Sequence, residues 1–394
     1  MKGESLGFCN TNCKNPDGVL QKNKNNRHGR DKMKKHLMSI LFVGLAAVSV
    51  FAGDPEVKFS GEVEFDAYTG DVINDDKQSH SYASTFDLNV DVKFNEQWSA
   101  SAQLEADGES TDPAAIYNGA FIQYTHNDKF AVKLGDLTFS EGAFLNYYGY
   151  DDPADNAAGM AEHDIRGFEI DYSGLLFGLG FGRGDNDRQA CIEEDGEEAC
   201  VGVAYDMHLA YELGLGEHVL RPFVDYKSYQ EAKHNELHAG LDANLKFGAF
   251  GLHAVYGLHA DYLGEDYPKA THAFLAEPSL EVGQVNVKGA VFYAYFDEDD
   301  PTVHGGEIPE YFFAYAEPGF AIAKFLALGI PLEYHTNTTD VNEDVSAFDV
   351  GLRAYLTPVD GLEITGFAMV DVPVGDDAGD DTGLHLGIES VFSF

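Results

Sequence analysis

The stretch that decides the fold is residues 57–67, which read VKFSGEVEFDA. Apolar residues or glycine occupy every second position from Val57 to Ala67, and Lys, Ser, Glu and Asp occupy the positions between them. Successive side chains of a β-strand point to opposite faces of a sheet, so this alternation predicts a strand with one apolar and one polar face. Residues 82–94, YASTFDLNVDVKF, repeat the pattern and predict a second strand.

The same period of two continues along the chain. Further clear examples are residues 98–106, 203–213, 237–247, 252–261, 285–296, 347–357 and 384–394. No stretch of comparable length has the 3.6-residue period of an amphipathic helix. The sequence therefore predicts an all-β protein.

The connections between these segments alternate in length. Eight short connections, such as Ser173–Gly174 and 317–323, alternate with nine long ones, of which residues 137–163 are the longest. This order predicts about 18 antiparallel strands, with the short turns at one end of the sheet and the long loops at the other. The count falls to 16 if the weaker segments, 175–182 and 310–316, are not strands.

The first part of the chain differs from the rest in charge. Residues 1–52 hold nine of the 25 basic residues but only three of the 67 acidic ones, so the rest is strongly acidic. From Met33, two lysines precede an apolar run that ends in small residues at Ala52, which is typical of a secretory signal peptide. We interpret 1–32 as a non-native or untranslated extension, 33–52 as the signal peptide and 53–394 as the mature domain.

The last predicted strand provides a resemblance to a known family. It ends at Phe394, and Leu384, Leu386, Ile388 and Phe392 lie on the same face. A terminal Phe that closes an alternating apolar strand resembles the recognition signal of Gram-negative outer-membrane β-barrels, and the loop lengths resemble those of porins. The resemblance is one of architecture and matches no porin subfamily. It implies a transmembrane antiparallel β-barrel over residues 53–394, closed because an open edge would leave backbone groups unpaired in lipid.

The resemblance also implies a location and partners. We expect the bacterial outer membrane, contact with its lipid and lipopolysaccharide, and recognition of Phe394 by the barrel-assembly machinery. Porins commonly form trimers, so a homotrimer is a further expectation, although the sequence leaves the oligomeric state open. The formal charge of −42 excludes nucleic acid as a partner, because phosphate binding needs a basic surface.

Strand parity assigns side chains to the two faces of such a barrel. Aromatic rings near strand ends are expected to face lipid: Tyr82, Phe94, Trp98, Tyr172, Tyr226, Phe247, Tyr295, Tyr334 and Phe394. Carboxylates are expected to face inward: Glu62, Glu64, Asp66, Asp87, Asp91, Asp206, Asp242, Asp349 and Glu389. Five histidines share the inward parity and are expected to be solvated: His208, His238, His253, His259 and His385. So many carboxylates cannot be packed dry without partners, so they predict a water-filled lumen.

The longest loop, residues 137–163, is the candidate for narrowing this lumen. The resemblance implies that the loop after the fifth strand folds into the pore. We predict that its carboxylates form the acidic side of the constriction: Glu141, Asp151, Asp152 and Asp155. Inward basic residues at mid-strand are the candidates for the opposite side: Lys133, Arg221 and Arg353. Together they would create a transverse field, unless each base is paired locally with a neighbouring acid.

Cys191 and Cys200, with eight residues between them, lie in an acidic stretch of a chain with an export signal. The default for such a pair is a local disulfide across one loop. No metal site and no cofactor are predicted, because acidic clusters lack a dedicated ligand spacing. No enzyme is predicted either, since no nucleophile-elbow, zinc-protease or phosphate-loop motif occurs.

These observations predict an outer-membrane porin, a water-filled diffusion channel for small hydrophilic solutes that favours cations. Two alternatives stay open. One is a substrate-selective channel in which Tyr147, Tyr148, Tyr150, Phe223 and Tyr355 stack on oligosaccharides. The other is a structural or adhesive surface barrel.

Overall fold

The computed structural model of this chain places one compact unit between Pro55 and Phe394. The predicted extension and signal peptide lie outside the described residues, as do most of the long loops. The residues described are 55–70, 72–73, 79–107, 117–145, 163–182, 189–194, 197–230, 235–261, 263, 269–297, 310–337, 345–374 and 382–394.

Every regular element in this described part is a β-strand, which confirms the all-β prediction. Over the same residues, no helix is long and apolar enough to cross a membrane. The first half of the sheet consists of β1 (Glu56–Gly70), β2 (Ser79–Lys93), β3 (Trp98–Asp107), β4 (Tyr117–Asn127), β5 (Phe130–Phe139), β6 (His163–Tyr172), β7 (Leu175–Gly182), β8 (Gln189–Glu194), β9 (Glu197–Tyr211), β10 (Leu213–Leu215) and β11 (His218–Tyr229). The second half consists of β12 (Glu236–Phe247), β13 (Phe250–Asp261), β14 (Lys269–Val282), β15 (Val285–Asp297), β16 (Glu310–Ala323), β17 (Leu326–Gly329), β18 (Leu332–Asn337), β19 (Val345–Val359), β20 (Leu362–Pro373) and β21 (Gly383–Ser393).

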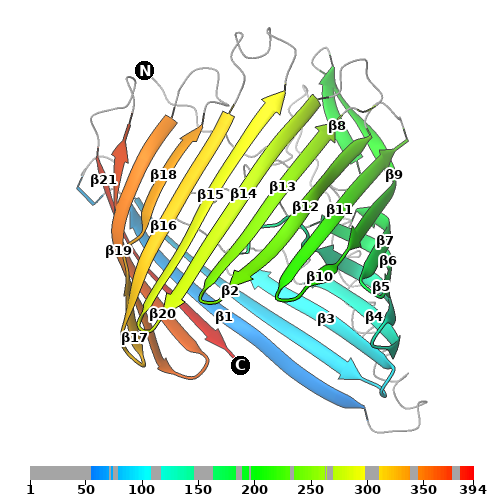
Figure 1. Ribbon diagram of the computed structural model, residues 1–394, viewed down its shortest axis with the longest axis horizontal. Helices are drawn as coiled ribbons and strands as arrows, with labels where there is room; N and C mark the ends of the chain where they lie inside the picture. Colours follow the sequence, from blue (N-terminus) through cyan, green and yellow to red (C-terminus); the bar gives the residue numbers. More distant parts are fainter. Residues whose placement is uncertain are drawn as a thin grey trace, which may run out of the picture. The chain divides into compact units, whose positions relative to one another are not determined.

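The sheet closes on itself (Figure 1). Successive strands pair antiparallel, and β21 returns to pair with β1, where Glu62 lies opposite Ser393. Beyond that pair Gly61 and Phe394 exchange two backbone hydrogen bonds, with N···O distances of 3.1 and 3.0 Å. The last residue therefore forms part of the seam that closes the described sheet, as a sheet in lipid requires.

The 21 strand segments make a barrel of 18 strands. β8 pairs with the start of β9 in a separate hairpin, and β10 continues β9 beside β11. β17 and β18 are two parts of one strand, because both pair with β16 and β19 on either side of an interruption at Ile330 and Pro331. The predicted count of 18 is confirmed, since the two weaker segments are the strands β7 and β16.

The short turns show one agreement and one difference. The hairpin between β6 and β7 turns at Ser173 and Gly174, whose φ values of 53° and 88° are those that a two-residue hairpin turn needs. The turn predicted at 317–323 lies later, because β16 runs to Ala323 and β17 begins after residue 325. Pro318, which lies inside the predicted turn, is part of the strand, and its carbonyl accepts a hydrogen bond from the Ile330 N–H at 3.0 Å.

The two faces of the wall differ as predicted for a barrel in lipid. Outward side chains such as Phe59 and Tyr82 are 64% and 72% exposed, whereas inward acids such as Asp206 and Glu333 are 0% and 1% exposed. A soluble sheet would bury its apolar face instead. Several predicted outward aromatics are among the exposed residues: Tyr82, Trp98, Tyr172, Phe247 and Phe394.

Candidate functional site

The candidate site is the lumen where the chain leaves β5 and turns inward. The backbone N–H of Gly142 donates to Asp242 Oδ2 on β12 at 3.3 Å. Three residues later the N–H of Leu145 donates to the Glu277 carboxylate on β14, at 3.0 Å to Oε2. Asp242 and Glu277 both point into the barrel, so residues 140–145 lie inside the lumen.

Glu141, the first predicted constriction acid, contacts the wall of the barrel. Its Oε2 lies 3.4 Å from Nε2 of His208 on β9. Burial raises the pKa of the Glu141 carboxyl, but its contact with His208 outweighs burial, so the pKa is lowered from its ordinary value. Glu141 therefore stays ionised in a site where burial alone would favour the neutral acid.

A network of histidines and carboxylates lies behind Glu141. His208 Nδ1 is 2.5 Å from Asp225 Oδ1, and His238 Nδ1 is 3.2 Å from the other oxygen of Asp225. His163 Nε2 is 2.8 Å from Asp206 Oδ1. These side chains come from β6, β9, β11 and β12, so the network links three adjacent strands, β9, β11 and β12, to β6, which lies beyond β7.

A second part of the network holds the two loop acceptors. His253 on β13 lies between them, with Nε2 3.3 Å from Asp242 Oδ1 and Nδ1 2.5 Å from Glu277 Oε2. The expectation of solvated lumen histidines is therefore wrong for His208 and His253, which are 0% and 3% exposed. The Nδ1 of each ring is hydrogen-bonded to a carboxylate, Asp225 for His208 and Glu277 for His253, in place of water.

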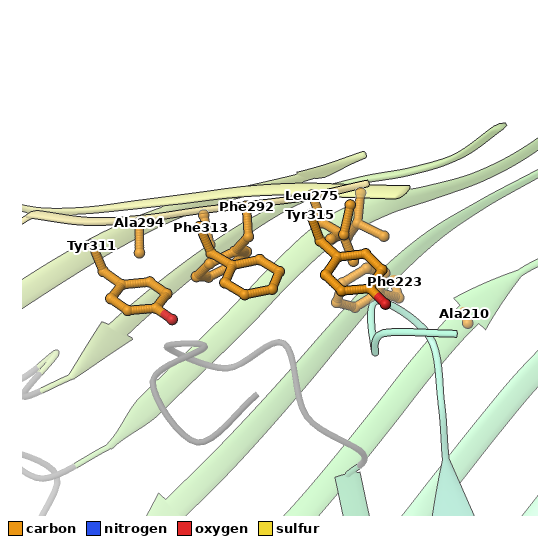
Figure 2. Close-up of a cluster of buried hydrophobic side chains, with 11 residues drawn as sticks. Ala210, Phe223, Leu275, Phe292, Ala294, Tyr311, Phe313 and Tyr315 are labelled. Atoms are coloured by element: carbon orange, nitrogen blue, oxygen red, sulfur yellow. The ribbon is translucent and has the colours of Figure 1, made fainter. Parts of the chain in front are cut away.

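An apolar cluster lines the same side of the lumen and was not predicted. Figure 2 shows its rings projecting to one side of the wall. The loop packs against this cluster, because the Phe144 and Phe292 ring centroids are 5.3 Å apart. The sequence signal was present, since these rings share the inward parity of their strands. The buried members are Ala210, Phe223, Val255, Ala273, Leu275, Ala290, Phe292, Ala294, Tyr311, Phe313 and Tyr315.

Phe223, one of the rings considered for sugar stacking, belongs to this cluster and is 2% exposed. An added Cβ on Gly142 would lie 2.6 Å from the Phe223 ring, so the loop backbone approaches the ring as closely as a glycine allows. The ring therefore packs against the loop rather than facing open solvent. Tyr355, the other described ring of that set, donates a hydrogen bond to Glu317.

The three predicted basic residues are all inward, and each is paired locally with an acid. Lys133 Nζ is 2.9 Å from Glu169, and Arg221 is 2.8 Å from Glu212. Arg353 lies 3.5 Å from Glu317 on β16. The same glutamate lies 3.3 Å from Lys288, and it accepts hydrogen bonds from Tyr315 and Tyr355.

A wall of carboxylates faces the lumen on β1, β2 and β21. Glu62 lies directly opposite Asp87, and Asp66 lies directly opposite Glu389. Like charges directly opposite each other in a sheet repel, so this arrangement is tolerated where water and cations screen the charges. The prediction of inward carboxylates is thus met on strands well separated in sequence from the loop.

Two predictions concern positions that are described only in part. Asp151, Asp152 and Asp155 lie outside the described residues. Cys191 and Cys200 are directly opposite each other in the β8–β9 hairpin. The backbone register therefore brings the two residues to the spacing that the predicted disulfide needs.

Comparisons with known proteins identify the fold. No protein-family model matches the chain, and no curated protein matches it in sequence. Its structure is similar to that of OmpT, an outer-membrane protein of Vibrio cholerae, with a TM-score of 0.53, 11% identity, and coverage of 87% of this chain and 99% of the other. An anion-selective porin from Comamonas acidovorans matches with a TM-score of 0.53, 10% identity, and coverage of 86% and 100%. OccK8 (OprE) of Pseudomonas aeruginosa matches with a TM-score of 0.52, 10% identity, and coverage of 86% and 98%.

These similarities show the fold: the chain forms a closed β-barrel like those of outer-membrane porins. At identities of 10–11%, the lumen-facing side chains of those proteins cannot be assumed for this chain. Its permeation properties must therefore be argued from its own residues.

Proposed function

We propose that this protein is an outer-membrane porin that lets small hydrophilic solutes diffuse passively through a water-filled lumen and favours cations. The carboxylate wall on β1, β2 and β21 is the observation that carries the proposal. Its facing pairs, Glu62 with Asp87 and Asp66 with Glu389, concentrate negative charge along one side of the lumen.

Fixed charge on a narrow, low-dielectric wall raises the local concentration of counter-ions. The described basic candidates offset this charge only in part, because Lys133, Arg221 and Arg353 each have a carboxylate neighbour of their own. We further propose that Glu141, with Asp151, Asp152 and Asp155 of the same loop, adds negative charge at the narrowest level. Cation preference then follows chiefly from the wall, and the loop adds a smaller contribution.

The membrane partners form part of the same proposal. The exposed outward face would contact outer-membrane lipid and lipopolysaccharide, and the barrel-assembly machinery would recognise Phe394, which is 51% exposed on that face. Export would use the predicted signal peptide, and the barrel would assemble as a homotrimer. Cell fractionation and cross-linking of intact cells test the location and the assembly.

Reversal potential in a planar bilayer under a salt gradient tests the selectivity. The refolded wild-type channel should give the sign of a cation-favouring pore. A double variant, Glu62→Gln with Asp87→Asn, should shift the potential toward zero. The control is Asp360→Asn, which removes an exposed acid at the turn before β20 and should leave the potential unchanged. An anion-favouring sign in the wild type, or equal shifts in both variants, would exclude the proposal.

A further inference from the structure

A second polar cluster lies on the inward side of β18 and β19, away from the loop contacts. It consists of Glu333 and His335 on β18 and Asp349 on β19, all of them buried. Each offers one ligand atom, and these atoms lie within 4.8 Å of one another. This spacing is close enough for the three atoms to share one ion after a small adjustment of the side chains.

The register of the sheet brings these groups together. Strand alternation puts Glu333 and His335 on one face, and the pairing of β18 with β19 places Glu333 directly opposite Asp349. The next strand adds a third acid, because Asp371 on β20 lies directly opposite Asp349. The register thus places three carboxylates in one row across three neighbouring strands. Figure 1 shows where β18 and β19 lie in the barrel.

Such a row is costly without a positive charge within it. Like charges directly opposite each other repel, and burial weakens the screening that water provides. Glu333 and Asp349 are only 1% and 3% exposed. Asp371 Oδ1 is also buried and has no hydrogen-bond partner among the described residues. The basic residue four positions further along β19, Arg353, forms an ion pair with Glu317 on β16, which does not belong to this row.

We propose that Glu333, His335 and Asp349 bind a divalent transition-metal ion such as Zn²⁺, with Asp371 as a further carboxylate beside it. An imidazole nitrogen together with carboxylate oxygens suits Zn²⁺ and related ions, whereas Mg²⁺ and Ca²⁺ prefer oxygen donors alone. A bound ion would link β18 to β19 close to Pro331, where the strand made of β17 and β18 is interrupted.

The competing explanation is that protonated His335 neutralises the acids without a metal, since its Nδ1 lies 3.8 Å from Glu333 Oε1. The amount of zinc that the refolded full-length protein binds distinguishes the metal site from the imidazolium explanation. The protein is incubated with ZnCl₂, separated from free metal by gel filtration, and its retained zinc is measured. His335→Asn and Asp349→Asn remove ligands, and His259→Asn on β13 is the matched control on the inward face.

Wild-type protein and His259→Asn should retain zinc at this site, while His335→Asn and Asp349→Asn should lose that zinc. The heat-modifiable gel shift shows that each variant is folded. Zn²⁺ should raise the midpoint temperature of heat unfolding, followed by the same gel shift, in wild type but not in His335→Asn. The proposal is overturned if wild type retains no zinc, or if His335→Asn and Asp349→Asn retain as much as wild type. Either result would support the imidazolium explanation.

Discussion

Removing the Glu277 carboxylate should release the loop from the lumen wall. This side chain accepts the Leu145 N–H at 3.0 and 3.2 Å and also contacts His253 at 2.5 Å. A hydrogen bond to a charged group contributes about 1.5 to 3 kcal/mol. Glu277→Ala should therefore raise the population of the detached loop about 10- to 150-fold, because about 1.4 kcal/mol corresponds to a factor of ten.

Glu277→Gln keeps an amide oxygen as acceptor but loses the charge. Charge-assisted hydrogen bonds are about twice as strong as neutral ones, so this variant should recover about half of the lost free energy. The order of loop release is thus wild type, Gln and Ala. The intermediate position of Gln separates loss of the bond from loss of side-chain volume.

Single-channel recording measures the effect as the frequency of brief current closures. Glu169→Ala is the matched control, because Glu169 is also a buried inward acid but is paired with Lys133 on the neighbouring strand. It should change conductance and leave the closure frequency close to wild type. Equal closure frequencies in Glu277→Ala, Glu169→Ala and wild type would refute the inference that Glu277 holds the loop.

Three further predictions address the loop and the hairpin. The pKa of Glu141 is lowered from 4.5, so its contact stabilises the loop above that pH and is lost as the pH falls through the lower folded value. Closures should therefore increase as the pH is lowered below about 4.5, and Glu141→Gln should abolish this increase. Phe144→Ala should weaken loop packing by about 1 to 3 kcal/mol and speed proteolysis of the loop in the folded barrel, whereas an unchanged rate would argue against this packing. The peptides that carry Cys191 and Cys200 should be joined in a non-reducing digest and separate on reduction, and free peptides before reduction would contradict the disulfide.

Local patterning predicted the barrel because lipid and water act on each strand separately. Residues 57–67 need no knowledge of distant residues to show which side faces which solvent. The turn near Pro318 was misplaced for the opposite reason. Pro318 lies in β16, and the length of β16 is set by its pairing with β15 on one side and with β17 on the other. Local turn propensity carries no information about these pairings.

The site was only partly predictable because its contacts join residues far apart in the sequence. Parity placed His208 and His253 on the inward face, but the acids beside them come from other strands and from the loop. The inward aromatic cluster was missed because Phe292 and Phe313 look like lipid-facing residues until the strand phase is fixed. Glu317 lies two residues after Tyr315 and so shares its face of β16, which indicates that this face points into the lumen.

The described loop contacts and the carboxylate wall lie on different strands, and this separation has a functional consequence. Residues 140–145 contact β9, β12, β14 and β15, whereas the facing acid pairs lie on β1, β2 and β21. Gating and ion selectivity should therefore respond to different substitutions. Glu277→Ala should change closure frequency with little effect on reversal potential, and Glu62→Gln should do the reverse. A single variant at either position that changed both properties equally would mean that the loop, rather than the wall, determines which ions pass.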